Sequence, residues 1–390
     1  MRSNTSSMSF ACAEAAIVSC SLSVASTRQS SGFGRGIPSV SKRLLLVVTL
    51  YLYFMPSEPS VTSLNARLLM RIEKVTLDFA AQSRGANALR ALDDISLDIA
   101  AGEIIGLVGE SGSGKTTLGK ALLGMYPARS GHIWYEGVDV TAAALRQRRR
   151  DLQMVFQDPL SSFNPRFRIG ASIALPLRMH GICRRKDLKA QVGKLLERVG
   201  LSADCAHRFP HELSGGQLQR VAIARVLGIQ PKLIVADEAV SKLDVSVRAQ
   251  VLNLLKTINR DIKVSIVFIT HDLSVARFLC DRVAVMYIGR IVELGPTESI
   301  FADPKHPYTR RLLEARRSQA IRDSAEEPTD LLLAGRSIDR SAGCDYRDRC
   351  PVRIRRCEVE RPDLEGASND RSFACFNPRG DDARARAAAR

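Results

Sequence analysis

The sequence predicts an α/β fold built around a largely parallel sheet. Runs of strand length that are apolar except at their ends occur at residues 104–109, 233–237 and 265–270, and helical patterns separate them. Such runs are typical of parallel strands that are buried on both faces and covered by helices. A glycine-rich turn follows the first run directly, which is where such folds bind phosphate.

The other elements follow from the same patterns. Residues 68–79 alternate in polarity like a half-buried strand, and residues 88–103 do so again before a turn. A helix is expected from about Lys115, after the glycine-rich turn. Further elements are a strand at 152–156 and helices at 184–199 and 245–258. No internal repeat is visible, so we expect one core of this kind.

Composition divides the 390 residues into four parts. Residues 66–335 are expected to form the α/β unit, and 336–378 a cysteine-containing module. Residues 379–390 form a tail rich in Arg and Ala. Residues 1–65 are Ser-rich without periodicity, and we expect them to be disordered or to lie upstream of the natural start.

Charge and apolar runs limit the classes of partner. The formal net charge of +16 favours an anionic partner, which could be a nucleotide, a nucleic acid or an acidic membrane surface. The apolar run at residues 44–55 has 12 residues, whereas a membrane-spanning helix needs roughly 20. A membrane anchor or a secretory signal remains the alternative interpretation of this run.

The stretch "GESGSGKTT", residues 109–117, fits the phosphate-loop pattern G-x-x-x-x-G-K-[ST]. Its glycines allow successive backbone N–H groups to surround phosphate oxygens at the start of a helix. Lys115 would reach the β- and γ-phosphates, and the Thr116 hydroxyl would hold Mg²⁺. The predicted nucleotide-binding residues of this loop are Gly109, Ser111, Gly112, Gly114, Lys115, Thr116 and Thr117.

Polar residues follow three of the predicted strands. Asp237 and Glu238 end the apolar run at 233–237, where Asp237 could bind Mg²⁺ and Glu238 could polarise an attacking water. His271 follows the run at 265–270 and could support that carboxylate. Gln157 follows the run at 152–156 and could bind Mg²⁺ or water. The alternatives are a solvated acidic turn, a structural histidine and an ordinary polar loop residue.

The stretch "LSGGQ", residues 213–217, raises a separate question. Ser214 and Gln217 have the spacing of a helix capping box. Gly215 and Gly216 in the first turn would each cost roughly 1 kcal/mol relative to Ala. An anion approaching the backbone at this helix start would explain the two glycines, and it would have to be a second phosphate site.

Taken in order, the phosphate loop, Gln157, LSGGQ, "LIVADE" at 233–238 and His271 resemble the ATP-binding subunit of an ABC transporter over about residues 68–315. The resemblance implies a parallel-sheet core with a small antiparallel β subdomain and a helical subdomain. It also implies two cassettes paired head to tail, so that Ser214–Gln217 of one close over the ATP of the other. Phe79 would stack on adenine and Asp244 would belong to the nucleotide site. Glu238 would be the general base supported by His271, and Gln157 would couple the site to the membrane subunit.

Four longer stretches resemble the oligopeptide and dipeptide importer branch of that family. They are "FQDPLSSFNPR", "HELSGGQLQRVAIAR", "LDVSVRAQVL" and "HPYTRRLLEA". This resemblance implies a peripheral subunit on the cytoplasmic face of a bacterial inner membrane. Its partners would be a second cassette, two permeases and an extracytoplasmic binding protein, with no nucleic acid. Peptides are the expected cargo, and nickel or another small solute is the alternative.

Four late cysteines form the remaining candidate site: Cys344, Cys350, Cys357 and Cys375. Four thiolates can hold zinc or an iron–sulfur cluster. The importer branch has a C-terminal cysteine motif of this kind, so the expectation here is a [4Fe–4S] cluster, with free thiols as the alternative.

Two features depart from this interpretation. "DEAVSKLD" at 237–244 places Ala239, Val240 and Lys242 where relatives usually have D-E-P-T-S-A-L-D, which affects a loop at the cassette interface. The arginine run "RQRRR" at 146–150, the basic charge and the cysteines suggest the alternative of a nucleic-acid-processing ATPase of the same superfamily, although the run is expected to be a solvated surface or a permease-facing patch. Such proteins generally carry two cassettes or long insertions, which this sequence lacks.

Overall fold

The computed structural model describes residues 67–79, 89–321, 343–367 and 370–378. All of them belong to one compact unit, Ser63–Arg390. The expectations for residues 1–65, for the run at 44–55 and for the tail at 379–390 lie outside the described residues, as does the boundary at 335–336.

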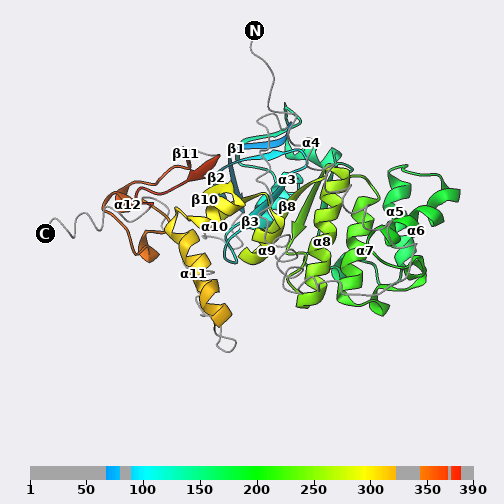
Figure 1. Cartoon of the computed structure of the whole chain (residues 1–390). Coiled ribbons are helices and arrows are strands. Elements are labelled where there is room, and N and C mark those ends of the chain that lie inside the picture. The colour runs from blue at the N-terminus through cyan, green and yellow to red at the C-terminus, as the bar shows by residue number, and fades with distance from the viewer. Residues whose placement is uncertain (1–66, 80–88, 322–342, 368–369, 379–390) are drawn as a thin grey trace, which may run out of the picture. The chain divides into compact units, whose positions relative to one another are not determined.

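Eight described strands form the core sheet, in the order β11-β12-β10-β9-β3-β8-β7-β6. Figure 1 labels β11, β10, β3 and β8 among them. The parallel part consists of β9 (Arg282–Tyr287), β3 (Ile104–Val108), β8 (Ser265–Thr270), β7 (Leu233–Asp237) and β6 (Leu152–Val155). The antiparallel edge consists of β10 (Arg290–Pro296), β12 (Arg371–Phe373) and β11 (Glu365–Ala367). The predicted parallel-sheet core is therefore confirmed.

Strand β3 shows why the apolar runs are uninterrupted. Ile104 and Val108 point into one hydrophobic cluster, whereas Ile105 and Leu107 point into the other. All four side chains are buried, because successive residues of a strand face opposite sides of the sheet and both sides are covered.

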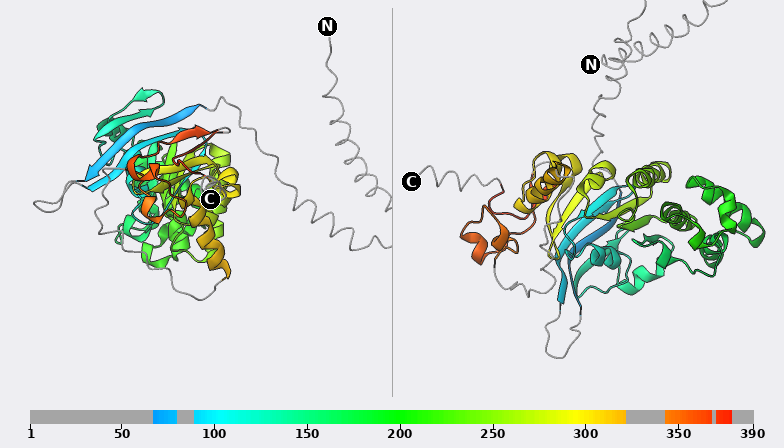
Figure 2. Two further views of the ribbon diagram at one scale, coloured as in Figure 1. Left: turned by 90° about the vertical axis from the view of Figure 1, so that its left-hand side faces the viewer. Right: turned by 90° about the horizontal axis from the view of Figure 1, so that it is seen from below.

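A second sheet of four antiparallel strands has the order β2-β1-β4-β5. The strands are β1 (Leu68–Phe79), β2 (Leu89–Ala100), β4 (Ser130–Tyr135) and β5 (Val138–Asp139). Their buried side chains share one hydrophobic cluster with helix α3 (Lys115–Leu122) and one face of the core sheet. Figure 2 shows this sheet, blue to cyan, as a layer of its own. The predicted antiparallel β subdomain is thus present.

Helices cover the other face of the core sheet. Helices α5 (Ile169–Met179), α6 (Leu188–Arg198) and α7 (Gly215–Leu227) contact one another, and α7 also contacts α8 (Val245–Ile262). The helix expected at 184–199 begins with a 3₁₀ turn, and its α-helical part starts at Leu188. The remaining described α-helices are α4 (Ala142–Gln147), α9 (Leu273–Leu279), α10 (Thr297–Ala302), α11 (Pro307–Ile321) and α12 (Arg356–Val359). In the described part of the chain, no helix combines the length and the apolar character needed to cross a membrane.

The C-terminal residues join the core sheet rather than forming a sheet of their own. Strand β12 pairs with β10, with Glu293 opposite Phe373. The Arg371 guanidinium donates to Glu293 at 2.5 Å, and the Glu293 side chain is fully buried. A buried carboxylate needs such a partner, so this ion pair fixes the C-terminal strand to the sheet.

Candidate functional site

The glycine-rich loop, residues 109–117, connects β3 to α3 as predicted. A Cβ on Gly109 would lie 2.2 Å from the Met286 carbonyl oxygen, so only glycine fits there. Gly114 has a φ of +98°, and its Cβ would lie 2.8 Å from the carbonyl oxygen of Ala91. Ser111 and Gly112 are exposed, and a Cβ on Gly112 would meet nothing within 4 Å. The loop is therefore packed on its inner side and open on its outer side.

The Lys115 side chain makes its hydrogen bonds to atoms of this same loop. Its ammonium donates to the carbonyl oxygens of Gly109 at 2.8 Å and Glu110 at 2.7 Å, and to the Ser113 hydroxyl at 3.3 Å. Burial lowers the pKa of Lys115 to about 8, because the charged form loses solvation. A buried ammonium whose partners are mostly neutral oxygens is suited to receive an anion.

Thr116 and Asp237, two of the three predicted Mg²⁺ ligands, come from distant parts of the sequence and are in contact. The Thr116 hydroxyl donates to Oδ1 of Asp237 at 3.0 Å. Asp237 is the last residue of β7, and burial raises the pKa of its carboxyl group. Hydroxyl and carboxylate oxygens are hard ligands of the kind that Mg²⁺ prefers, with phosphate oxygens and water completing its shell. The residues present therefore fit a nucleotide-bound magnesium ion.

Three predicted residues meet at the carboxyl ends of β6, β7 and β8. Nε2 of Gln157 donates to Oε2 of Glu238 at 2.7 Å. Nδ1 of His271 lies 3.1 Å from Oε1 of the same carboxylate, and donates to it in the Nδ1–H tautomer. Glu238 has a φ of +44°, a left-handed conformation that is costly for this residue type. Its backbone N–H donates to the Ile269 carbonyl oxygen at 3.0 Å, which helps to hold that conformation.

The LSGGQ stretch begins helix α7 with the predicted capping box. The Ser214 hydroxyl accepts from the Gln217 N–H, and the Gln217 side chain accepts from the Ser214 N–H. The two glycines differ, however. A Cβ on Gly216 would lie 2.1 Å from Cγ1 of Val247 on α8, so packing inside the chain requires this glycine. Gly215 and Ser214 are exposed. Packing explains Gly216, so an approaching anion is needed to explain only the glycine at position 215.

Phe79 and Asp244 lie apart from the contacts described so far. The Phe79 ring is half-buried and packs edge-on against Tyr126, with the ring centroids 5.1 Å apart. Asp244 is the N-cap residue of α8, but its side chain makes no capping hydrogen bond and is exposed. In the loop at 237–244, which departs from the usual sequence, Ala239 and Val240 are buried in the core, whereas Lys242 is exposed.

The four late cysteines come near one another without forming a metal site. The Cys344 N–H donates to the Cys357 carbonyl oxygen at 2.8 Å, and none of the four forms a disulfide. Burial raises the pKa of Cys344 to about 11 and that of Cys375 to about 12. Across the described residues, no three His, Cys, Asp or Glu side chains are grouped so that they could hold a metal ion. The structure therefore does not support the expected iron–sulfur cluster.

Sequence reasoning did not include two residues that contact the phosphate loop. The Glu110 N–H donates to the Tyr308 hydroxyl at 2.9 Å, and the Glu110 carboxylate pairs with Arg349 at 3.2 Å. These partners lie 198 and 239 residues further along the chain. Tyr308 belongs to the stretch "HPYTRRLLEA" noted above, but no local pattern indicated that Tyr308 or Arg349 contacts the loop.

The chain is similar to known families and solved structures. Residues 92–241 match the model of the ABC transporter family, and residues 292–357 match that of the oligopeptide/dipeptide transporter C-terminal region. A "Putative peptide import ATP-binding protein" of Brucella abortus (strain 2308) is 44% identical over 318 residues, covering 79% of this chain and 93% of the relative. A protein of the same description from Brucella ovis is 42% identical over 301 residues, covering 76% and 94%.

Solved structures show the same fold. A "post-hydrolysis state of the ATP-binding cassette MJ0796 bound to ADP and Pi" is 28% identical, with a TM-score of 0.53, and covers 59% of this chain and 99% of that chain. CbiO1 from Clostridium perfringens is 24% identical, with a TM-score of 0.55, and covers 65% and 99%. The second likeness concerns the fold alone.

The fold and the loop define a P-loop ATPase of the cassette type. The chain belongs to the ABC transporter family, as an ATP-binding subunit of the branch with the oligopeptide/dipeptide C-terminal region. The activity of this class is ATP hydrolysis coupled to transport. The relatives described above are peptide import proteins, and they give no support to the nucleic-acid-processing alternative.

Proposed function

We propose that this chain binds and hydrolyses MgATP as one of two cassettes that drive a bacterial peptide importer. The observation that carries the proposal is the position of Glu238. Gln157 and His271 hold its two carboxylate oxygens from either side, next to the contact between Thr116 and Asp237. A carboxylate held this way can orient and deprotonate a water molecule that attacks a γ-phosphate.

The residues have distinct tasks in this reaction. The phosphate loop and Lys115 bind the phosphates, and the attacking water gives a proton to Glu238 as its oxygen bonds to the γ-phosphorus. The bond from that phosphorus to the β–γ bridging oxygen breaks, and ADP leaves with those electrons. His271 orients the Glu238 carboxylate. Bound Mg²⁺ would neutralise phosphate charge, and Thr116, Asp237 and Gln157 would hold it directly or through water.

A second cassette would complete the site. The exposed Ser214 and Gly215 at the start of α7 offer a hydroxyl and an open helix N-terminus for an anion. The structure of MJ0796 is described as dimeric, which supports the same arrangement here. Under this proposal the exposed Asp244 and Lys242 face the partner cassette, and Phe79 stacks on the adenine of the chain's own ATP.

Peptide import is supported by the C-terminal region and by the descriptions of the relatives. The proposed partners are two membrane permeases and an extracytoplasmic binding protein, with the chain at the cytoplasmic face of the inner membrane. No metal centre in the C-terminal module enters the proposal, because the four thiols do not form a ligand group in this structure.

Affinity purification of the tagged chain from membranes in mild detergent tests the importer assignment. We expect two polytopic permeases and a second cassette in the mass spectrum, and ATPase activity in the purified complex. A peptide-binding protein encoded with those permeases would support peptides as cargo. Recovery of nucleic acid or repair proteins without permeases would overturn the importer assignment, and a nickel-binding partner protein would overturn peptide as the cargo.

A further inference from the structure

We propose that Arg349 is a positioning residue for ATP binding, which acts by neutralising Glu110 in the phosphate loop. The loop at residues 109–117 is the proposed binding site of the polyphosphate. Glu110 is its one carboxylate. An unpaired carboxylate there would repel an ATP molecule of the same charge sign. Arg349 reaches this carboxylate from the cysteine-containing C-terminal module. This role rests on the proposed ATP-binding function and involves a part of the chain outside the cassette motifs.

The contact between the two side chains is bidentate. Nη1 of Arg349 lies 3.2 Å from Oε2 of Glu110, and Nη2 lies 3.5 Å from Oε1. The Arg349 side chain is 19% exposed and that of Glu110 is 37% exposed. A bidentate guanidinium–carboxylate pair orients the carboxylate as well as neutralising its charge. Partial burial reduces the screening of this pair by salt.

Glu110 is also held through its backbone. Its N–H donates to the Tyr308 hydroxyl at 2.9 Å, while its carbonyl oxygen accepts from Lys115 at 2.7 Å. Tyr308 is fully buried, and its ring packs against Tyr287 and Tyr346 with centroids 4.6 and 5.6 Å away. Tyr308 of α11, against which Tyr346 of the C-terminal module packs, therefore helps to hold the backbone of the residue whose carbonyl oxygen binds Lys115.

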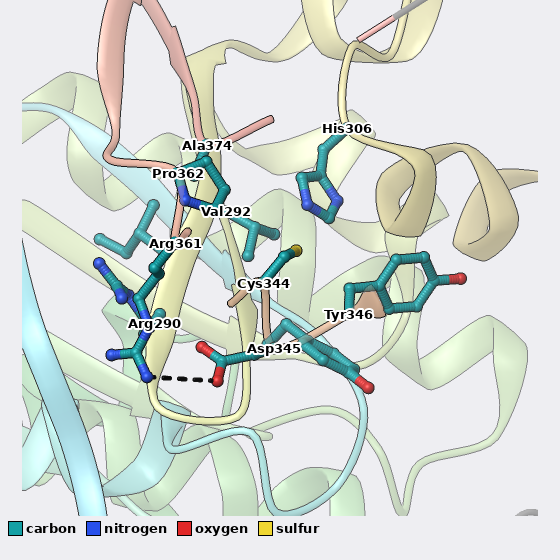
Figure 3. Close-up of a pocket in the computed structure, with 11 residues that line it drawn as sticks. Arg290, Val292, His306, Cys344, Asp345, Tyr346, Arg361, Pro362 and Ala374 are labelled. Carbon is teal, nitrogen blue, oxygen red and sulfur yellow. Dashed lines mark ion pairs between the residues drawn. The ribbon is translucent and has the colours of Figure 1, made fainter. Parts of the chain in front are cut away.

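Several contacts attach the C-terminal module, which carries Arg349, to the rest of the described unit. Arg361 pairs with Asp93 of β2 at 2.8 Å and with Asp345 at 3.7 Å. Figure 3 shows Arg361, Cys344 and Tyr346 around a small pocket, with Val292 of β10 and His306 on its other sides. Together with the pairing of β12 and β10, these contacts hold Arg349 in place over the loop.

The test compares ATP dissociation constants of full-length variants, measured by calorimetry with MgATP. Arg349→Gln should weaken ATP binding about tenfold, the effect of leaving one partly buried charge unpaired near an anion. The double variant Glu110→Gln/Arg349→Gln should return to within about twofold of wild type, because no unpaired carboxylate remains. In steady-state hydrolysis, Arg349→Gln should raise KM with kcat retained, since Glu238 is untouched.

Arg356→Gln is the matched control, because Arg356 forms an exposed ion pair with Glu360 at 2.6 Å within the same module. It should bind ATP like wild type. Equal affinity of Arg349→Gln and wild type would overturn the proposal. A double variant that binds ATP as weakly as Arg349→Gln would also overturn it. Arg349 would then affect binding by stabilising the C-terminal module and not by neutralising Glu110. A wild-type chain that binds ATP no better than Lys115→Ala would instead refute the nucleotide site itself.

Discussion

Gln157 and Glu238 are joined by a hydrogen bond of 2.7 Å, which ties the loop after β6 to the carboxylate after β7. His271 lies 3.1 Å from the other carboxylate oxygen. The carboxylate that we propose as the general base is therefore oriented by groups that follow two neighbouring strands, and each neighbour can be removed without touching the phosphate loop. Preorganisation of this kind lowers the barrier because the carboxylate needs no rearrangement during the reaction.

Replacement of His271 tests that orientation. His271→Ala should lower kcat for ATP hydrolysis about 100-fold, the typical contribution of one group to acid–base chemistry. ATP affinity should change little, because His271 contacts Glu238 rather than the phosphate loop. His132→Ala is the control, since His132 forms an exposed pair with Asp139 far from these residues in sequence. A kcat in His271→Ala equal to that of the control would contradict the assigned role.

The lowered pKa of Lys115 predicts proton uptake on ATP binding. Burial lowers this pKa to about 8, so part of the Lys115 population is neutral just above that pH. Phosphate binding stabilises the ammonium and raises its pKa, so the chain should take up protons from pH about 8 upward. Calorimetry at pH about 8.5 in buffers of different ionisation enthalpy measures this. Lys115→Arg should abolish the uptake because arginine stays charged. Equal proton uptake in wild type and Lys115→Arg would mean that a group other than Lys115 takes up the proton.

The packing of Gly216 predicts a stability effect inside LSGGQ. A methyl group there would overlap Val247, so Gly216→Ala should lower the free energy of unfolding by about 2 kcal/mol. Adding Val247→Ala should make the Gly216→Ala change much less costly, because the overlapping methyl group is gone. Gly215→Ala should change stability by less than about 1 kcal/mol. Urea denaturation measures all of these, and equal costs for the two glycines would refute the packing explanation.

The contact between Thr116 and Asp237 predicts how hydrolysis depends on magnesium. Thr116→Val removes the hydroxyl while keeping the branched shape, and should raise the Mg²⁺ concentration for half-maximal ATPase activity about tenfold, a loss typical of one metal ligand contact. Thr116→Ser keeps the oxygen and should resemble wild type. The titration is made at fixed ATP concentration. Identical Mg²⁺ curves for the valine and serine variants would mean that the Thr116 hydroxyl is not a ligand.

Much of the site could be predicted because it depends on strand ends. Parallel strands bring their carboxyl ends to one edge, so the apolar runs placed Gln157, Asp237 and His271 at the same edge of the sheet. Their closeness follows from the strand order, in which β7 lies between β6 and β8. The phosphate loop was predictable for a similar reason, since its pattern is local and lies between a strand and a helix.

The rest depends on contacts that leave no local signal. Position 216 requires glycine because Val247 on another helix packs against it. From the sequence alone, this glycine suggested that an anion approaches the backbone. Strands β11 and β12 have three residues each, too few to show a period. Arg349 meets Glu110 across 239 residues, which only the folded chain reveals.

The most direct test of the account is the Glu238→Gln variant of the full chain. With Gln157, His271 and the phosphate loop intact, it should bind MgATP with near wild-type affinity. Single-turnover hydrolysis should fall about 1,000-fold, because the water has lost its base. Gel filtration in ATP should then show a dimer that does not form with ADP. Hydrolysis at the wild-type rate by Glu238→Gln would contradict the assignment of Glu238 as the base and, with it, the proposed mechanism.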